Sequence, residues 1–223
     1  MNRSKPSRSA SASSRSRSRQ QGGFPWWLVA VGVVVLLGAI VVATAATGDD
    51  PKSAREFGVV DVSGTPLATF DPTVTDPAVG AVAPALHGVD FDGESVVIGP
   101  GRATMIVFMA HWCPHCNREA PRLRSWIDGG GVPEHVDVII VPTGSSATAP
   151  NWPPSDWLRT QGLDEVPVLV DDEATTAAGA FGLDGYPYVV TLDANAQVVE
   201  RRSGEQPEGA FAAMADRLPA PAE

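Results

Sequence analysis

Residues 112–116 read Trp-Cys-Pro-His-Cys and contain the only two cysteines in this chain of 223 residues. Directly before them, residues 103–110 form a continuous apolar stretch of strand length, and residues 117–127 have a sequence typical of a helix. The pattern therefore predicts a strand that delivers a Cys-x-x-Cys pair to the first turn of a helix. Unpaired backbone N–H groups and the helix dipole stabilise negative charge at that place. The arrangement is suited to thiol–disulfide exchange, in which a thiolate is the attacking species.

The two cysteines have different predicted roles. Cys113 lies at or just before the helix N-terminus, which favours a thiolate, so we assign it the role of nucleophile. Cys116 follows one turn later and is the expected resolving thiol. His115 adds cationic character near neutral pH, and Pro114 lacks an N–H that the first turn of a helix does not need. This chemistry requires no metal and no organic cofactor.

Three other uses of the cysteines remain open on the sequence alone. A Cys-x-x-Cys pair can be half of a zinc site, but a second pair is absent from the chain. The cysteines could bind Cu(I) together with His111 or His115, which would make the protein a redox-inactive copper carrier. The third possibility is a structural disulfide, although a loop this short gains little from the chain-entropy effect.

Charge is distributed unevenly along the chain. Residues 1–25 contain six basic residues and no acidic residue, which leaves a balance of −16 for the rest of the protein. The Ser/Arg-rich tail has few apolar side chains, so we expect it to be disordered and cytoplasmic. The acidic remainder would repel phosphate groups, which argues against nucleic acid as a partner.

A segment without charges follows the tail. Residues 26–46 are long and apolar enough to cross a membrane as one helix. Basic residues precede the segment and Asp49 and Asp50 follow it, so the positive-inside rule places the remaining chain outside the cytoplasm. A cleaved signal peptide is the alternative, since residues 43–45, Ala-Thr-Ala, fit a cleavage site. In both cases the cysteines reach a compartment in which disulfides persist.

The rest of the chain predicts a linker and one domain. Residues 47–83 are rich in Pro, Thr, Asp and Gly, and we expect a linker that is partly ordered where it meets the domain. Residues 84–218 are enough for one core, and residues 219–223 form a short tail. Alternating strand and helix patterns predict an α/β domain with a mixed sheet covered by helices on both faces. The expected strands are 89–91, 95–98, 103–110, 136–141, 166–170, 188–192 and 197–201, and the expected helices are 117–127, 155–161, 172–181 and 207–218.

Residues 110–116, Ala-His-Trp-Cys-Pro-His-Cys, resemble the active site of the thioredoxin superfamily, whose shared motif is Trp-Cys-x-x-Cys. The Pro-His dipeptide is similar to that of the oxidising enzyme DsbA, whereas the layout resembles the membrane-anchored TlpA/ResA/DsbE group. The resemblance implies a thioredoxin-like fold with an N-terminal hairpin and a helix–strand insertion at residues 155–170. It also implies that Trp112 supports the site and that Pro187 is a cis-proline opposite the dithiol. The backbone of Tyr186 would then bind an extended substrate strand.

One position departs from the family pattern. The buried carboxylate that often lies six residues before the first cysteine is replaced here by Val107. Glu119 is near in sequence, three residues beyond Cys116, but it need not replace that group. Water, His115 or an acid from the insertion are the other candidates for proton handling.

Together these observations predict an extracytoplasmic, membrane-tethered thiol–disulfide oxidoreductase. It would exchange disulfides with exported proteins through Cys113 and Cys116, and it would need a redox partner in the membrane or outside the cytoplasm. The Pro-His pair favours an oxidase because it stabilises the reduced form. The TlpA-like layout favours a reductase, so the direction remains open at this point.

Overall fold

The computed structural model describes residues 56–220. The predicted basic tail and the predicted membrane-spanning segment 26–46 lie outside these residues. Within the described part of the chain, none of the helices combines the length and apolar character needed to cross a membrane.

A four-stranded mixed sheet forms the centre of the domain, with the strand order β5-β4-β6-β7. Strand β4 pairs in parallel with β5 and antiparallel with β6, and β6 pairs antiparallel with β7. The predicted mixed sheet is therefore confirmed. The bounds of the four strands are Ala103–Met109 (β4), Val136–Pro142 (β5), Tyr188–Leu192 (β6) and Val198–Ser203 (β7).

Strand β4 is buried along its whole length, which explains its uninterrupted apolar sequence. Successive side chains of a strand point to opposite faces. Met105 and Val107 accordingly pack in one core with helix α2, whereas Ile106 and Phe108 pack in a second core on the other face. The dithiol follows directly from the carboxyl end of this central strand.

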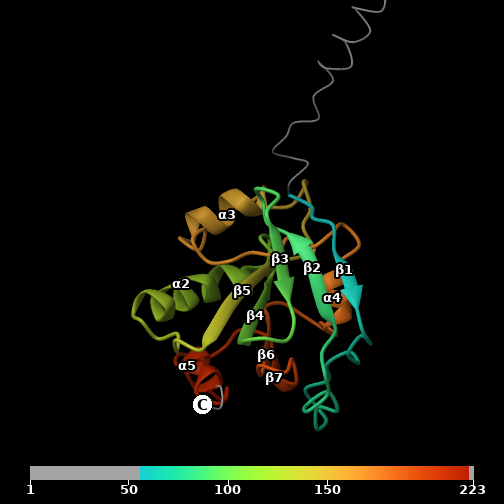
Figure 1. The fold of residues 1–223 in the computed structure, drawn as a ribbon. Coiled ribbons are helices and arrows are strands. Elements are labelled where there is room, and N and C mark those ends of the chain that lie inside the picture. The colour runs from blue at the N-terminus through green and yellow to red at the C-terminus, as the bar shows by residue number, and fades with distance from the viewer. Residues whose placement is uncertain (1–55, 221–223) are drawn as a thin grey trace, which may run out of the picture. The chain divides into compact units, whose positions relative to one another are not determined.

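Different elements cover the two faces of the central sheet (Figure 1). Three helices contribute to the first core: α2 (Pro114–Asp128), α3 (Pro154–Thr160) and α5 (Ala210–Ala215). The second core receives α4 (Thr176–Ala180) and a three-stranded antiparallel sheet, β1 (Asp61–Ser63), β2 (Ala85–Val89) and β3 (Ser95–Ile98). Helices are expected on both faces, but the second face carries one short helix and a sheet, in which β2 and β3 form an antiparallel pair that fits the N-terminal hairpin implied by the resemblance.

The chain before residue 84 takes part in the domain. Strand β1 pairs with β2, and the buried side chains of Leu67 and Ala78 belong to the second core. Glu56 is also buried, and its carboxylate accepts a hydrogen bond from the Ser155 N–H at the start of α3. The ordered domain therefore includes residues 56–83, which lie in the segment expected to be a linker.

The strand expected at residues 166–170 is wrong as a full strand. Only one bridge forms, between Val168 and Ile140 of β5, although the Ile140 N–H donates to the Pro167 carbonyl and the Leu169 N–H donates to the Ile140 carbonyl. Pro167 has no N–H to donate, so it interrupts the ladder at the edge of the sheet.

Candidate active site

The dithiol lies at the N-terminus of α2, as the sequence predicted. Cys113 is the N-cap residue, and its Sγ accepts a hydrogen bond of 3.4 Å from the N–H of Cys116. Pro114 occupies the first turn. Both cysteines are free thiols. A thiolate on Cys113 would thus receive the unpaired N–H groups and the positive end of the dipole of a helix of 15 residues.

The environment separates the two sulfurs chemically. Cys116 is completely buried in the first core, and this burial raises the pKa of its thiol well above the ordinary value. A thiol in such a place stays protonated until another group accepts its proton. Cys113 retains slight exposure, at 4%. The arrangement is suited to attack by Cys113 and later resolution by Cys116.

The segment around Pro187 lies against the sulfur of Cys113. The Tyr186–Pro187 peptide bond is cis, as the sequence resemblance implied. The Cys113 thiol contacts the carbonyl oxygen of Tyr186, with 3.8 Å between Sγ and O. Trp112 donates its indole N–H to the carbonyl of Gly144 at 2.7 Å and presents its ring edge-on to Tyr186. Trp112 therefore holds the tyrosine beside the dithiol.

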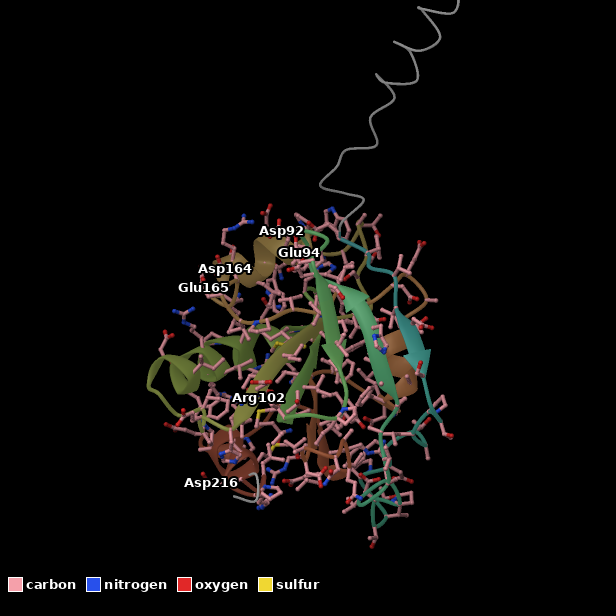
Figure 2. The ribbon with its side chains drawn as sticks, in the orientation of Figure 1. Asp92, Glu94, Arg102, Asp164, Glu165 and Asp216 are labelled. Atoms are coloured by element: carbon pink, nitrogen blue, oxygen red, sulfur yellow. The ribbon has the colours of Figure 1, made fainter. Side chains whose placement is uncertain are left out.

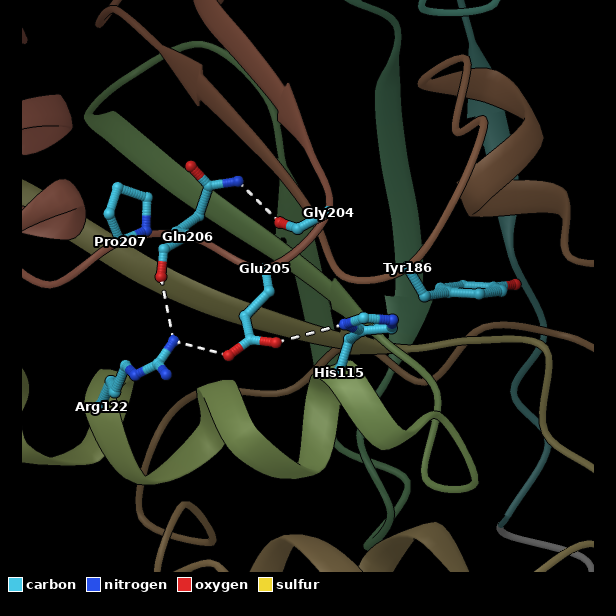
Figure 3. Close-up of a pocket in the computed structure, with 7 residues that line it drawn as sticks. All are labelled: His115, Arg122, Tyr186, Gly204, Glu205, Gln206 and Pro207. Carbon is cyan, nitrogen blue, oxygen red and sulfur yellow. Dashed lines mark hydrogen bonds and ion pairs between the residues drawn. The ribbon is translucent and has the colours of Figure 1, made fainter.

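His115 belongs to a network of charged groups (Figure 3). Its Nδ1 lies 3.2 Å from the carboxylate of Glu205, which also accepts from Arg118 and Arg122. Glu205 lies in the loop that connects β7 to α5. Hydrogen bonds from Arg118 and then from His115 lower the pKa of Glu205 to about 2, so this carboxylate is ionised at any working pH. No motif in the sequence pointed to Glu205, because it lies 90 residues from His115.

No protein-family model matches the chain. Two curated relatives are both called methylamine utilization protein MauD. The protein of Paracoccus denitrificans is 29% identical over 75% of this chain and 72% of its own length. That of Methylophilus methylotrophus is 27% identical over 66% of this chain and 65% of its own.

Two solved structures are similar to the domain in fold. A protein of Chlorobium tepidum assigned as thiol:disulfide interchange protein DsbE superposes with a TM-score of 0.50, at 20% identity, over 62% of this chain and 94% of that one. A protein of Bacteroides thetaiotaomicron assigned as a protein disulfide isomerase gives 0.50 at 22% identity, over 62% and 86%. The chain has a thioredoxin-like fold. The resemblance inferred from residues 110–116 is confirmed at this level.

Glu119 is a buried acidic residue on α2 that its position in the sequence alone did not assign to the site. It is completely buried on α2, and burial raises the pKa of its carboxyl to about 7. One carboxylate oxygen accepts the N–H of Gln206, and the other has no hydrogen-bond partner within the described residues. The charge of Glu119 also contributes to the raised pKa of Cys116, after the larger effect of burial.

The position of Glu119 could have been inferred. Residues three apart lie on the same face of a helix, so Glu119 follows Cys116 into the core. Val107 packs in the first core together with both cysteines, so no carboxylate occupies that position of β4. The spacing was visible in the sequence, but the burial of the Glu119 side chain was not.

His111, which the sequence offered as a candidate copper ligand, is completely buried. Its Nδ1 lies 2.7 Å from the carbonyl oxygen of Pro150 and must donate there, and its Nε2 accepts the N–H of Ser146 at 3.1 Å. Burial also lowers the pKa of its imidazole. Since both nitrogens are occupied, His111 cannot bind copper without losing these bonds. Among the described residues, no group of three or more His, Cys, Asp and Glu side chains is placed to hold a metal ion.

Asn117 orients the turn that carries the dithiol. Its amide group donates to the carbonyls of Cys113 and His111, at 2.8 and 3.2 Å, and its carbonyl oxygen accepts the indole N–H of Trp157 at 2.9 Å. Trp157 is a core residue at 3% exposure. The Trp157 indole therefore positions the active-site turn from the core side, through Asn117.

Proposed function

We propose that the protein is a thiol–disulfide oxidoreductase that uses Cys113 and Cys116. The observation that carries this proposal is the asymmetric dithiol at the start of α2. The sulfur of Cys113 lies at the N-cap against the carbonyl of Tyr186, whereas that of Cys116 is buried behind it. The thioredoxin-like fold, which occurs in the structures assigned to disulfide interchange, supports the same chemistry.

The reaction consists of two exchanges. The thiolate of Cys113 attacks one sulfur of a client disulfide, forms a mixed disulfide and releases the other client sulfur as a thiolate. Cys116 then loses its proton and attacks the sulfur of Cys113, which releases the second client thiolate and leaves the Cys113–Cys116 disulfide. Two electrons pass from the enzyme dithiol to the client. The reverse sequence oxidises a client dithiol.

Glu119 is the proposed proton acceptor for Cys116. A general base works best when its pKa lies near the working pH, and the pKa of Glu119 is raised to about 7. Its carboxylate oxygen without a partner is available for a proton. In the reverse direction the same group would return the proton to the thiolate of Cys116.

Tyr186 and Pro187 form the proposed binding edge for the client. The backbone of Tyr186 lies beside the sulfur of Cys113, so an extended client segment can pair with it while its own sulfur reaches the dithiol. We further propose that residues 26–46 tether the domain outside the cytoplasm, where its clients are exported proteins. The MauD relatives are named for a single process, methylamine utilization, which favours a small set of clients over general disulfide exchange.

The contacts of His115 bear on the direction of the reaction. A Pro-His pair promotes oxidation when the histidine stabilises the thiolate of the reduced form. Here the negative charge of Glu205 lies beside both His115 and Arg118, and so it offsets the positive potential that this part of α2 presents to Cys113. We therefore propose a couple that is less oxidising than its Pro-His dipeptide alone would indicate. A redox partner of the dithiol or disulfide class must restore the enzyme after each turnover.

A trapping experiment tests the proposal directly. In the full-length Cys116→Ser variant the second exchange cannot occur, so clients should accumulate as mixed disulfides on Cys113. These adducts would be detected by non-reducing electrophoresis of the purified protein and mass spectrometry. The matched Cys113→Ser variant should trap no clients, because Cys116 is buried. Absence of adducts from Cys116→Ser, or equal adducts from both variants, would contradict the proposed roles.

A further inference from the structure

Two arginines lie next to the dithiol in a domain that is otherwise acidic. Residues 56–220 contain 23 acidic residues but only eight arginines and no lysine. The exposed acidic side chains of Asp92, Glu94, Asp164 and Glu165 lie on the upper side of the view in Figure 2, and the exposed Asp216 lies at the lower end. Two of the eight arginines, Arg118 and Arg122, nevertheless lie on the face of α2 that borders the active site.

A pocket with a volume of about 490 Å³ opens beside Tyr186. His115 and Arg122 line it from α2, and the segment 204–207 lines it from the β7–α5 loop. The loop is joined to the binding edge, because the N–H of Gly204 donates to the Pro187 carbonyl at 2.8 Å. A client residue close to the reacting cysteine would therefore place its side chain at this pocket.

The charges in the pocket are only partly balanced. Glu205 offers one carboxylate to two guanidinium groups and to His115. Arg118 and Arg122 remain about half exposed, at 51% and 43% of their side chains. Each guanidinium carries five N–H donors, so each can donate hydrogen bonds to a second carboxylate that approaches from solvent.

We propose that this pocket selects clients that carry a carboxylate side chain within about two residues of their reacting cysteine. Arg118 and Arg122 would bind that carboxylate, and Glu205 would disfavour it by occupying the same donors. The inference rests on the proposed exchange function and adds the chemical class of the client. The inference also explains why two arginines lie at this place on an otherwise acidic surface. They attract a negative client segment that the rest of the domain repels.

Three peptides test the selection in the full-length protein. They are identical except for Asp, Asn or Lys two positions from a single cysteine, which is presented as a mixed disulfide with a neutral thiol. Rate constants for attack by Cys113 are measured by acid quench and mass spectrometry at low salt. We expect the Asp peptide to react about fivefold faster than the Asn peptide, as exposed ion pairs allow, and the Lys peptide to react more slowly. In about 0.5 M salt the ratios should approach one.

Variants identify the responsible groups. Arg118→Gln and Arg122→Gln should reduce the Asp-to-Asn ratio, and Glu205→Gln should increase it, which a misfolded protein would not mimic. Arg102→Gln is the matched control, because Arg102 precedes β4 whereas the dithiol follows it at the other end of the strand. Equal rates for all three peptides, or a ratio that survives both arginine variants, would overturn the inference. Failure of the Asn peptide to react at all would instead overturn the proposed exchange function.

Discussion

Glu119 and Cys116 are both completely buried on α2, three residues apart. Burial of Cys116 stabilises its neutral form, so resolution of a mixed disulfide needs a base at close range. Burial of Glu119 raises the pKa of that carboxyl to about 7. The low polarity of the core thus raises both pKa values, and it places the carboxyl in the range in which it can both accept and return a proton.

We predict that Glu119→Gln slows resolution and removes its pH dependence. In the parent protein, release of a client from Cys113 should accelerate as pH rises through about 7, where Glu119 ionises. Glutamine cannot accept the proton, so release should be about 100-fold slower above that pH. Rapid-quench measurement of the mixed disulfide follows this step separately from the first attack. An unchanged pH profile in the variant would exclude Glu119 as the base.

The same variant has a stability signature. The folded protein keeps a proton on Glu119 between the ordinary pKa of 4.5 and about 7, so its stability falls as pH rises through this interval. Glutamine does not ionise, and the variant should gain up to about 3 kcal/mol relative to the parent between pH 4 and pH 8. Urea unfolding at both pH values measures the gain. The exposed Glu208→Gln control should show no comparable change.

The β7–α5 loop connects three parts of the site. Gly204 binds the Pro187 carbonyl, Glu205 binds His115, and Gln206 binds the carboxylate of Glu119. The sequence offered no motif for this loop, because its contacts with α2 join residues 87 and 90 positions apart and because Gly204 and Gln206 act through their backbone N–H groups. By contrast, the helix that carries the dithiol was predictable, since its N-cap, its proline and its spacing are all local features.

We predict that Glu205→Gln makes the Cys113–Cys116 couple more oxidising. Without the carboxylate, the positive charge of Arg118 would no longer be offset, and it would stabilise the thiolate of the reduced form. The redox potential should rise by about 10–20 mV, the range that one exposed ion pair allows. Equilibration with glutathione at fixed pH measures it, and Glu208→Gln serves as the control on the same loop. A lower potential in Glu205→Gln would show that the network acts differently on the sulfur.

At the scale of the molecule, local patterns predicted the central sheet better than the domain boundary. Strand β4 and its neighbours are continuous apolar runs, which periodicity detects. Residues 56–83 contain few such runs, and they are ordered by contacts with distant partners. Arg201 of β7 is the main example: it is buried and donates to Asp76 and to the Ala68 carbonyl, and its guanidinium lies over the ring of Phe70.

The buried pair Arg201–Asp76 gives the final prediction. The Nε of Arg201 lies 2.8 Å from the carboxylate of Asp76. The Arg201 side chain is completely buried, and that of Asp76 is 12% exposed. Asp76→Ala should cost about 3–5 kcal/mol of unfolding free energy, because it leaves a buried charge without its partner. The double variant Asp76→Ala/Arg201→Met should recover much of this loss, since it removes both charges. Chemical unfolding of the parent, of Asp76→Ala, of Arg201→Met and of the double variant measures the coupling free energy between the two residues.

The neighbouring residue provides the control for this cycle. Arg202 pairs with Glu200 on the same strand, but both side chains are partly exposed, at 28% and 21%. Arg202→Met should therefore change stability by less than about 1 kcal/mol. If Asp76→Ala were equally mild, apolar packing and the backbone hydrogen bonds of Leu67 and Phe70 would be enough to hold residues 66–78. A large loss confined to Asp76→Ala would instead make the Arg201–Asp76 pair the contact that fixes this segment to the sheet behind the active site.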